Sequence, residues 1–553
     1  MDNQRLVLFI LFTFSVFMLY ESWQRETRPP VAPVPVAGAP AGSSQTAVPT
    51  PTQPLTATPA APAPAAAQPA PAGALQRGET VRVETDLLVA DINTAGGDLR
   101  RLELLNHRDT VDMKKNFLLL QEAEHTYVAQ AGLIGGALPN HRTKWTATVN
   151  AAKLADGAQS VSVRLTAPEA DGLRVSKVYT FYRGRYEIDV SFEVENKGTN
   201  AVTPDAYFQL VRDGKAPEGD SAMLPTFTGV AVYTDREKFL KLPFTDIEKG
   251  KATYPKKAGD GWIAIVQHYF LSAWLPKANA PREYFTQRSD SGLYSAGVIL
   301  SLGKIEAGST GTLVVPLYAG PQEQDKLEAL APGLELTVDY GSLTVIAKPL
   351  FWFLQWLYHW VGNWGGAIIL LTVAIKLVFY PLSAASYRSM ARMRIVAPKM
   401  QRLKEQYGDD RQRMSQAMME LYRTEKINPL GGCLPVVVQI PVFIALYWVL
   451  LASVELRHAP FMLWINDLSN PDPWFVLPTL MGATMIFQTY LNPEPPDPVQ
   501  AKIMKIMPIA FSIMFFFFPA GLVLYWLINN ILSIAQQWQI TRAMESAKPA
   551  HGK

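Results

Sequence analysis

The sequence predicts a multi-span α-helical membrane protein with six transmembrane helices, five of which form a core, and a large external all-β domain. Three observations lead to this fold class. Residues 6–20 form an unbroken apolar run, residues 79–335 alternate apolar and polar residues at the period of β-strands, and residues 362–540 carry long apolar segments.

Length and composition exclude several classes of protein. The chain has 553 residues and a net charge of +3, which is too small to indicate nucleic acid binding. The single cysteine, Cys433, excludes an internal disulfide and a cysteine-based metal cluster. The external domain must therefore be stabilised by its hydrophobic core alone.

The N-terminal apolar run, LVLFILFTFSVFMLY, approaches the length of a spanning helix when it is extended to Trp23. A cleaved signal peptide is the alternative, because its apolar region is equally short. Tyr20, Glu21 and Ser22 stand where a small-residue cleavage site would be needed. We therefore expect an uncleaved anchor with its N-terminus in the cytoplasm.

A stretch rich in proline and alanine, residues 29–75, follows the anchor. It contains no charged residue between Arg28 and Arg77 and cannot bury a core. Such a composition predicts an extended, semi-rigid tether.

Short strands separated by turns such as Gly96-Gly97 fill the external domain. The expected strands are TVRVET (80–85), SVSVRLT (160–166), LRVSKVYTFY (173–182), RYEIDVSFEVEN (185–196), GWIAIVQH (261–268) and TLVVPLY (312–318). Antiparallel strands without long helical periods indicate a large β-sandwich. Residues 321–334 then predict a short helix that leads to the membrane.

Four histidines lie in this domain, so a metal enzyme or a sugar-processing enzyme must be considered. They are His107, His125, His141 and His268. Their spacing is not that of metal ligands, and no carboxylate pair stands out as catalytic. The sequence therefore favours ordinary polar positions on strands.

Lys376 lies near the centre of a hydrophobic helix expected over residues 365–382. A cation this deep in a ~30 Å hydrocarbon layer costs roughly 2.5–3.5 kcal/mol on insertion scales, so it normally faces a wet cavity, a partner or a ligand path. Thr372 and Tyr380 lie one turn to either side on the same predicted face. The alternative is a lysine that snorkels to the headgroups.

An aromatic-rich segment, residues 343–360, precedes the lysine helix and includes Trp352, Trp356 and Trp360. This composition predicts a helix that lies in the membrane interface. If the segment were instead the start of the first core span, that span would be overlong.

A polar stretch, residues 383–433, follows the lysine helix with ten basic residues against five acidic ones. Residues 453–473 carry one basic residue against three acidic ones. This difference places the first stretch in the cytoplasm and the second outside.

Helical spacing predicts a hairpin within the cytoplasmic stretch. Met393, Met400 and Tyr407 recur every seven residues, and Met418 belongs to a second helical pattern after a turn at 408–410. The methionines favour mutual packing of the two helices, although methionines also suit varied apolar contacts. The basic face is either a solvated surface or a docking site for ribosomal RNA.

Four further apolar segments complete the predicted core, and they contain polar residues that a simple anchor does not need. These residues are Gln439, Gln488, Ser512, Asn529, Asn530, Ser533 and Gln537, with Trp526 beside them. One such residue commonly joins two helices. A lysine together with several amides favours the lining of a hydrated groove.

Four stretches of the sequence resemble the YidC-type membrane insertases of Gram-negative bacteria, a family that includes the Alb3 and mitochondrial oxidase-assembly proteins. They are NWGGAIILLTVAIKLVFYPLS, MARMRIVAPKMQRLKEQYGDD, KINPLGGCLPVVVQIPVFIALYWVL and PAGLVLYWLINNILSIAQQ. The resemblance implies a periplasmic β-supersandwich similar to sugar mutarotases but without a known enzyme role. It also implies a positively charged groove, open to cytoplasm and lipid, whose cation is usually arginine; Lys376 keeps the charge and loses the bidentate fork.

The resemblance implies an insertase and chaperone of the inner membrane rather than an enzyme, with both termini in the cytoplasm. The expected partners are nascent membrane proteins, the Sec translocon (SecYEG and SecDF), the ribosome and membrane lipids, with no specific nucleic-acid sequence. We expect no cofactor and no metal, since the sequence has no phosphate-binding loop or metal motif. The alternatives are a solute or ion transporter that uses the same groove, although no inverted repeat is visible, and a membrane-anchored sugar enzyme.

The expected groove residues are Lys376, Thr372, Tyr380, Gln439, Ser512, Tyr525, Trp526, Asn529, Asn530 and Ser533. The expected ribosome or client contacts of the hairpin are Arg392, Arg394, Lys399, Met400, Arg402 and Lys404. The expected divisions are an anchor (1–24), a linker (25–78), a periplasmic domain (79–335), an interfacial helix (336–361), the second transmembrane helix (362–382), the cytoplasmic hairpin (383–433), the third helix (434–452), a periplasmic loop (453–473), the fourth helix (474–491), a cytoplasmic loop (492–502), the fifth helix (503–518), the sixth helix (519–540) and a cytoplasmic tail (541–553).

Overall fold

The computed structural model describes residues 48–51, 76–123, 125–135, 137–217, 226–408, 410–425, 434–491 and 498–546. The chain divides into two compact units, which are Pro30–Val338 and a second unit made of Met1–Pro29 and Asp339–Lys553. The predicted N-terminal anchor and most of the linker lie outside the described residues.

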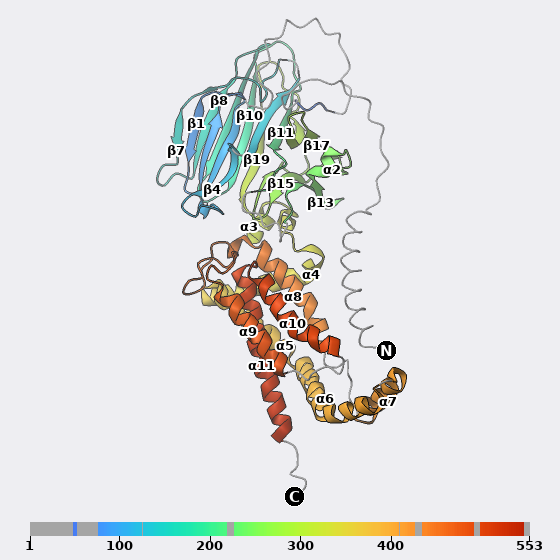
Figure 1. Cartoon of the computed structure of the whole chain (residues 1–553). Coiled ribbons are helices and arrows are strands. Elements are labelled where there is room, and N and C mark those ends of the chain that lie inside the picture. Colours follow the sequence, from blue (N-terminus) through green and yellow to red (C-terminus); the bar gives the residue numbers. More distant parts are fainter. Residues whose placement is uncertain are drawn as a thin grey trace. The chain divides into compact units, whose positions relative to one another are not determined.

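The first unit is built from two large sheets (Figure 1). The ten-stranded sheet has the order β14 (Lys257–Ala258), β17 (Arg282–Arg288), β18 (Tyr294–Ser301), β11 (Asp205–Arg212), β5 (Thr126–Ile134), β4 (Asn116–Glu122), β3 (Asp98–Arg108), β2 (Leu88–Asn93), β1 (Thr80–Glu84) and β7 (Ala151–Lys153). The nine-stranded sheet has the order β13 (Lys238–Pro243), β12 (Gly229–Thr234), β15 (Trp262–Gln267), β16 (Phe270–Trp274), β19 (Thr310–Pro321), β10 (Glu187–Asn196), β9 (Leu173–Tyr182), β8 (Ser160–Thr166) and β6 (Thr146–Ala147). Neighbouring strands are antiparallel except for the parallel pair β1–β7.

The period-two pattern of the sequence produces the core between the sheets. In β10, every second side chain, from Ile188 to Asn196, is buried, and the residues between them are partly exposed. Phe192 of one sheet meets Phe208 of the other edge to face, with ring centroids 5.8 Å apart. The β-rich architecture expected for this region is therefore present.

A buried lysine joins the two sheets. Lys177 of β9 is fully buried, and its ammonium donates hydrogen bonds of 2.9, 3.2 and 2.6 Å to the carbonyl oxygens of Gly96, Gly97 and Ala131 in the other sheet. Gly96 lies at a turn with φ +88°, and a Cβ atom there would stand 2.6 Å from the His141 carbonyl. The turn therefore requires glycine to present its carbonyls to the lysine.

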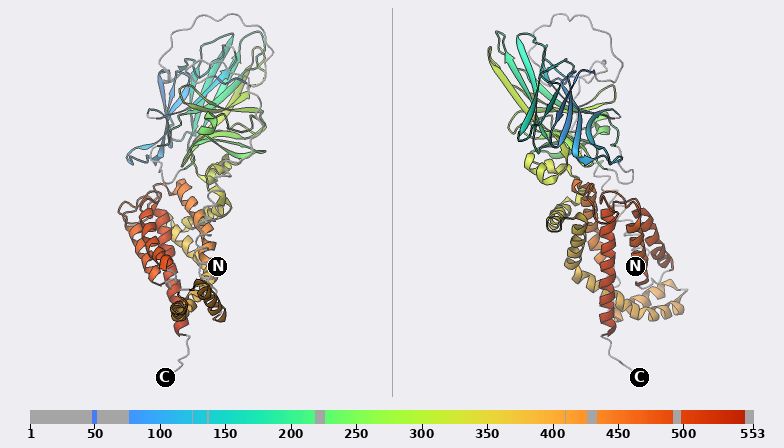
Figure 2. Two further views of the ribbon diagram at one scale, coloured as in Figure 1. Left: turned by 45° about the vertical axis from the view of Figure 1, so that its right-hand side comes forward. Right: turned by 90° about the vertical axis from the view of Figure 1, so that its left-hand side faces the viewer.

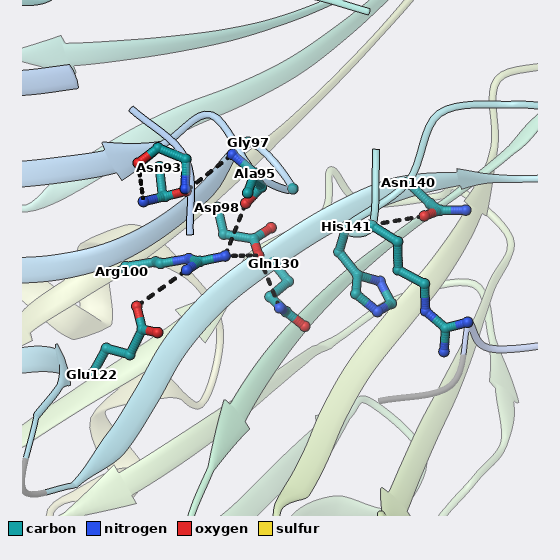
Figure 3. Close-up of polar contacts among 12 residues, drawn as sticks. Asn93, Ala95, Gly97, Asp98, Arg100, Glu122, Gln130, Asn140 and His141 are labelled. Carbon is teal, nitrogen blue, oxygen red and sulfur yellow. Dashed lines mark hydrogen bonds and ion pairs between the residues drawn. The ribbon is translucent and has the colours of Figure 1, made fainter. Parts of the chain in front are cut away.

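A buried carboxylate lies beside this lysine. Asp98 accepts a 2.9 Å hydrogen bond from Gln130, and Arg100 lies 3.9 Å from Asp98 and 3.2 Å from Glu122 (Figure 3). Burial raises the pKa of Asp98 to about 6, although the charges of Lys177 and Arg100 oppose this shift. Burial likewise lowers the pKa of Lys177 to about 8.

The helical elements are short in the first unit and long in the second (Figure 2). The first unit contains α2 (Phe244–Glu248), α3 (Gln324–Leu330) and η1 (Leu334–Thr337). The second contains η2 (Gly341–Leu343), α4 (Thr344–Val361), α5 (Trp364–Val378), α6 (Tyr380–Tyr407), α7 (Arg411–Thr424), α8 (Leu434–Ala452), η4 (Val454–Leu456), α9 (Val476–Leu491), α10 (Pro498–Phe515) and α11 (Ala520–Ser546). Helix α11 packs against α5, α6 and α9.

The helix predicted over residues 365–382 does not continue to its expected end. Helix α5 ends at Val378, and α6 begins at Tyr380 with a bend of 66° between them. Pro381 stands in the first turn of α6, where its missing N–H is tolerated, and proline disfavours helical continuation through the residue before it. Among the described residues, no single helix meets the combined length and hydropathy of a membrane span, while the bent pair formed by α5 and the first part of α6 does so together.

The described part of residues 383–433 forms two packed helices, α6 and α7 (Figure 1). Val396 and Met400 of α6 are buried against Met418, Leu421 and Tyr422 of α7. The Asp410 carboxylate accepts hydrogen bonds from the first backbone N–H groups of α7, which fixes the start of that helix.

Replacing Lys177 tests the link between the sheets. We expect Lys177→Met to lower the unfolding free energy of the β-sandwich by about 3–5 kcal/mol, because Asp98 then keeps only Arg100 as an opposite charge and three carbonyls lose their donor. Adding Asp98→Asn should restore part of this loss. Hydrogen exchange of β9 amides in the full-length protein measures both effects, and Lys153→Met, at a lysine exposed on β7, is the control. A loss no larger than the control's would contradict this role.

The pH dependence of the same domain tests the buried carboxyl group. The pKa of Asp98 in the folded state, about 6, lies above its usual value of 3.8, so its contribution to stability is complete below 3.8 and is lost as the pH rises through about 6. We expect wild type to lose stability between pH 4 and pH 6 relative to Asp98→Asn. Parallel stability curves for the two proteins would show that Asp98 does not titrate in this window.

Candidate functional site

The second unit holds a buried lysine at the centre of its helices. Lys376, near the C-terminal end of α5, is only 6% exposed, and its ammonium donates a 2.7 Å hydrogen bond to the Ser533 hydroxyl of α11. Helix α5 begins at Asn363, whose side chain accepts a hydrogen bond from the Gly366 N–H. Apart from Thr372, the other residues of α5 are apolar, so few polar groups of this helix lie near the lysine.

Further hydrogen bonds extend from Ser533 to a third helix. The Ser533 hydroxyl donates to the Asn529 backbone carbonyl at 2.7 Å, and Gln439 of α8 donates to the Asn529 side-chain oxygen at 2.8 Å. Tyr387 of α6 also interacts with the Ser533 hydroxyl. The predicted residues Lys376, Ser533, Asn529 and Gln439 therefore form one connected group that joins α5, α8 and α11.

Three other predicted groove residues lie near the centre of the helices but make separate contacts. The Thr372 hydroxyl donates to the Ile368 carbonyl within α5, and the Ser512 hydroxyl donates to its own helix at Pro508. Asn530 donates to Thr484 of α9 at 3.4 Å. Thr372 and Asn530 are buried, so these polar groups are enclosed rather than facing an open groove.

The structure corrects the placement of two predicted groove residues. Tyr380 belongs to α6, beyond the bend, and is exposed, so it does not share the face of Lys376. Tyr525 is almost fully buried and does not face lipid. Trp526 packs edge to face on Phe443 of α8 at 4.5 Å, and its buried indole N–H has no hydrogen-bond partner among the described residues.

The hairpin residues divide into exposed and buried positions. Arg392, Lys399 and Arg402 are exposed on α6, and Lys399 pairs with Glu425 at 2.6 Å. Met400 is buried in the seam between α6 and α7, so it is not available for the direct contact that was expected. The side chains of Arg394 and Lys404 lie outside the described part of the structure.

Sequence reasoning missed two members of the site, Tyr387 and Thr484. Tyr387 lay in a stretch assigned to a cytoplasmic hairpin, whereas α6 begins beside α5 and brings its first turns against α11. Thr484 lies on α9 and receives the Asn530 amide. Counting the polar residues on the helices that face α11 would have suggested Thr484. No feature of the sequence pointed to Tyr387.

The positive charge of the site favours binding of an anionic ligand. Within the described residues, the Lys376 ammonium forms no ion pair, and one of its three N–H donors has a protein partner. A buried ammonium gains most from a carboxylate, which supplies both charge and acceptors. The arrangement can therefore bind a carboxylate that reaches α5.

Two histidines of the β-sandwich, His125 and His141, contact different residues. His125 lies 3.3 Å from Asp213, and His141 contacts the Tyr207 hydroxyl. Among the described residues, no group of three or more histidine, cysteine, aspartate or glutamate side chains is placed to hold a metal ion.

Two family models match successive parts of the chain. The model described as the YidC periplasmic domain matches residues 80–353, and the model described as the 60Kd inner membrane protein matches residues 356–548. Curated relatives match over the full length. The membrane protein insertase YidC of Nitrosospira multiformis is 55% identical over 99% of this chain and 98% of the relative, and that of Aromatoleum aromaticum is 55% identical over 100% of both.

Solved structures show a weaker likeness. One described as an active YidC insertase is 18% identical and covers 84% of this chain and 94% of its own, with a TM-score of 0.38. A galactose mutarotase related enzyme from Lactobacillus acidophilus is 9% identical and covers 43% of this chain and 97% of its own, with a TM-score of 0.30. The full-length sequence identity, and not these scores, decides the assignment: the chain belongs to the YidC family, whose members combine a periplasmic domain with an inner membrane part.

Proposed function

We propose that the protein is a membrane protein insertase that moves short hydrophilic segments of nascent inner-membrane proteins across the bilayer and releases their helices into lipid. The full-length relatives named membrane protein insertase YidC support this class of activity rather than an enzymatic reaction. The observation that carries the mechanism is Lys376, a buried cation whose protein partner is the neutral hydroxyl of Ser533.

The energetic problem is the passage of a polar tail through hydrocarbon. Each unsatisfied polar group costs several kcal/mol in the bilayer core. The polar group around Ser533, with Gln439 and Asn529, lies among the helices and offers replacement hydrogen bonds. The indole N–H of Trp526, which has no hydrogen-bond partner in the described part of the chain, supports hydration of this region when the helices separate.

Lys376 supplies the attraction that draws the tail inward. A carboxylate of the tail takes the place of the Ser533 hydroxyl on the ammonium, where low dielectric strengthens the attraction. The contact is transient because the client's apolar helix then partitions into lipid. Its burial drives the reaction at roughly 25 cal/mol per Å², so the step needs no nucleotide.

We assign the five core spans to α5, α8, α9, α10 and α11, and a sixth to the predicted anchor, residues 1–24. Large apolar side chains exposed on these helices, such as Leu377, Phe487 and Ile513, support contact with lipid. Helices α5 and α9 have 15 and 16 residues, or roughly 23 Å of helix, and such short spans thin the surrounding bilayer. Both termini then lie in the cytoplasm, and residues 453–473 lie on the periplasmic side of the helices.

The hairpin of α6 and α7 is proposed to receive the chain at the cytoplasmic side. Its exposed cations, Arg392, Lys399 and Arg402, suit the phosphate backbone of ribosomal RNA. The same site can serve insertion by the protein alone or together with the Sec translocon, because both routes deliver a hydrophobic segment with a short polar tail.

Charge reversal at Lys376 tests the mechanism. A contact attraction of about 4 kcal/mol at an effective dielectric constant of 20 becomes a repulsion, so we expect Lys376→Glu to insert a client with a short acidic tail at least about tenfold less well. The measurement is protease protection of the client, made in vitro without added ATP, in liposomes containing the purified protein. Lys376→Arg should remain active.

Lys502→Glu is the matched control, because it reverses an exposed charge near the start of α10. Equal protection by wild type and Lys376→Glu would contradict a role of the cation while leaving the insertase activity in place. No protection above that of empty liposomes, with the protein folded, would contradict insertion by this protein alone.

Removing the hydroxyl of Ser533 tests the resting contact. We expect Ser533→Val to destabilise the helical unit by about 1–3 kcal/mol, because a buried ammonium then loses its protein acceptor. Ser533→Thr has nearly the same volume as valine and keeps the hydroxyl, so it should stay close to wild type. Thermal unfolding in detergent measures the difference. Equal losses in the two variants would indicate a steric effect instead.

A further inference from the structure

The loop that joins α8 to α9 has a rigid apolar tip. We define the external tip as Met462, Leu463, Trp474 and Phe475, which are 56%, 80%, 68% and 45% exposed. Leu463 and Phe475 both have φ +55°, a conformation that bulky residues rarely adopt. The backbone is therefore strained at the positions where apolar side chains point outward. Such strain is typical of functional sites.

A buried carboxylate, Asp472, and a largely buried one, Asp467, hold the tip in this form. Asp472 accepts hydrogen bonds from the Trp464 indole N–H at 2.9 Å, from the Trp474 N–H at 3.0 Å and from the Leu477 N–H at 2.7 Å. The Trp464 and Trp474 rings stack with centroids 5.5 Å apart. Asp467 accepts from His458, Ser469 and Asn470 within the same loop. Both carboxylates are turned inward, so the tip itself carries no charge.

The same loop is fixed to the helices. The carbonyls of Leu468 and Asn470 accept hydrogen bonds of 2.9 and 2.8 Å from the Gly521 and Ala520 N–H groups at the start of α11. The Asn363 amide donates at 2.9 Å to the Phe461 carbonyl, at the start of α5. The depth of the tip in the bilayer is therefore tied to the depth of both helices that carry the Lys376–Ser533 pair.

The apolar surface of the tip is continuous with the exposed apolar surface of the helices. The Phe475 ring packs against Phe516, just beyond α10, at 5.2 Å, and Leu480 on the next turn of α9 is exposed. Uncharged tryptophan and leucine side chains at the end of spanning helices suit the boundary between headgroups and acyl chains. A tip facing water would gain nothing from its strained, uncharged form.

We propose that the external tip inserts into the outer leaflet of the inner membrane and sets the depth of α5 and α11. This inference rests on the proposed placement of α8 to α11 in the bilayer. Its partner is the lipid layer itself. The Asp472 carboxylate acts as a positioning residue, because it holds Trp474 and the stacked Trp464 without touching lipid.

A depth measurement on the full chain in liposomes tests the proposal. An environment-sensitive fluorophore is attached at position 463 through Leu463→Cys, with the natural thiol removed by Cys433→Ser. Quenching by aqueous iodide is compared with quenching by lipids that carry a spin label at shallow and deep positions of the acyl chain. Matched controls are Ile513→Cys, exposed on α10, and Val111→Cys, exposed on the β-sandwich.

We expect the label at position 463 to be quenched by the shallow spin label and to be about fivefold less sensitive to iodide than the label at position 111, because ions are excluded from hydrocarbon. Iodide sensitivity equal to that at position 111, with position 513 still quenched by lipid, would overturn the inference and leave the membrane placement intact. Iodide access at both 463 and 513 in a folded protein would overturn the placement as well.

Discussion

A buried ammonium group must find acceptors for its three N–H bonds, and the two units meet this requirement to different extents. Lys177 has three carbonyl acceptors between the sheets, with Asp98 nearby as an opposite charge. Lys376 has one acceptor among the described residues, the Ser533 hydroxyl. Polar groups with all their hydrogen-bond partners stabilise one arrangement of the chain. A buried cation with too few acceptors gains free energy when a ligand supplies them. The first lysine therefore stabilises the β-sandwich, and the second is the one that we propose binds the client.

The exchange proposed for Lys376 depends on the neutral character of its partner, Ser533. A buried carboxylate of the protein would bind the ammonium strongly, and a client carboxylate would then have to compete with a permanent charge. A serine hydroxyl accepts a hydrogen bond from the ammonium in the resting state and contributes only a small free energy. When a client carboxylate replaces the hydroxyl, no second buried charge is left without a partner. Since the Ser533 hydroxyl also donates to Asn529, it keeps a partner of its own when it loses the lysine.

Local patterns predicted much of this structure, and contacts between distant segments explain the remainder. Period-two alternation identified β10, and polar spacing on the last helix identified Asn529 and Ser533. Tyr380 was misplaced because the helical pattern runs through Pro381, where the backbone bends. No periodicity could show that Ser533 meets Lys376, or that Tyr387 joins them, because these contacts depend on how α5, α6 and α11 pack.

The hydrogen bonds that join the helices differ between the two ends of the helical unit. At the external end, the α8–α9 loop is bonded to the starts of α5 and α11 through backbone carbonyls, which are costly to leave unpaired. At the other end, α5 terminates at the bend before α6, and side-chain hydrogen bonds at Ser533 and Asn529 add to the packing of the helices. In the proposed topology this is the side from which a cytoplasmic client reaches Lys376. Exchange of the side-chain hydrogen bonds at Ser533 leaves the backbone hydrogen bonds of the loop intact.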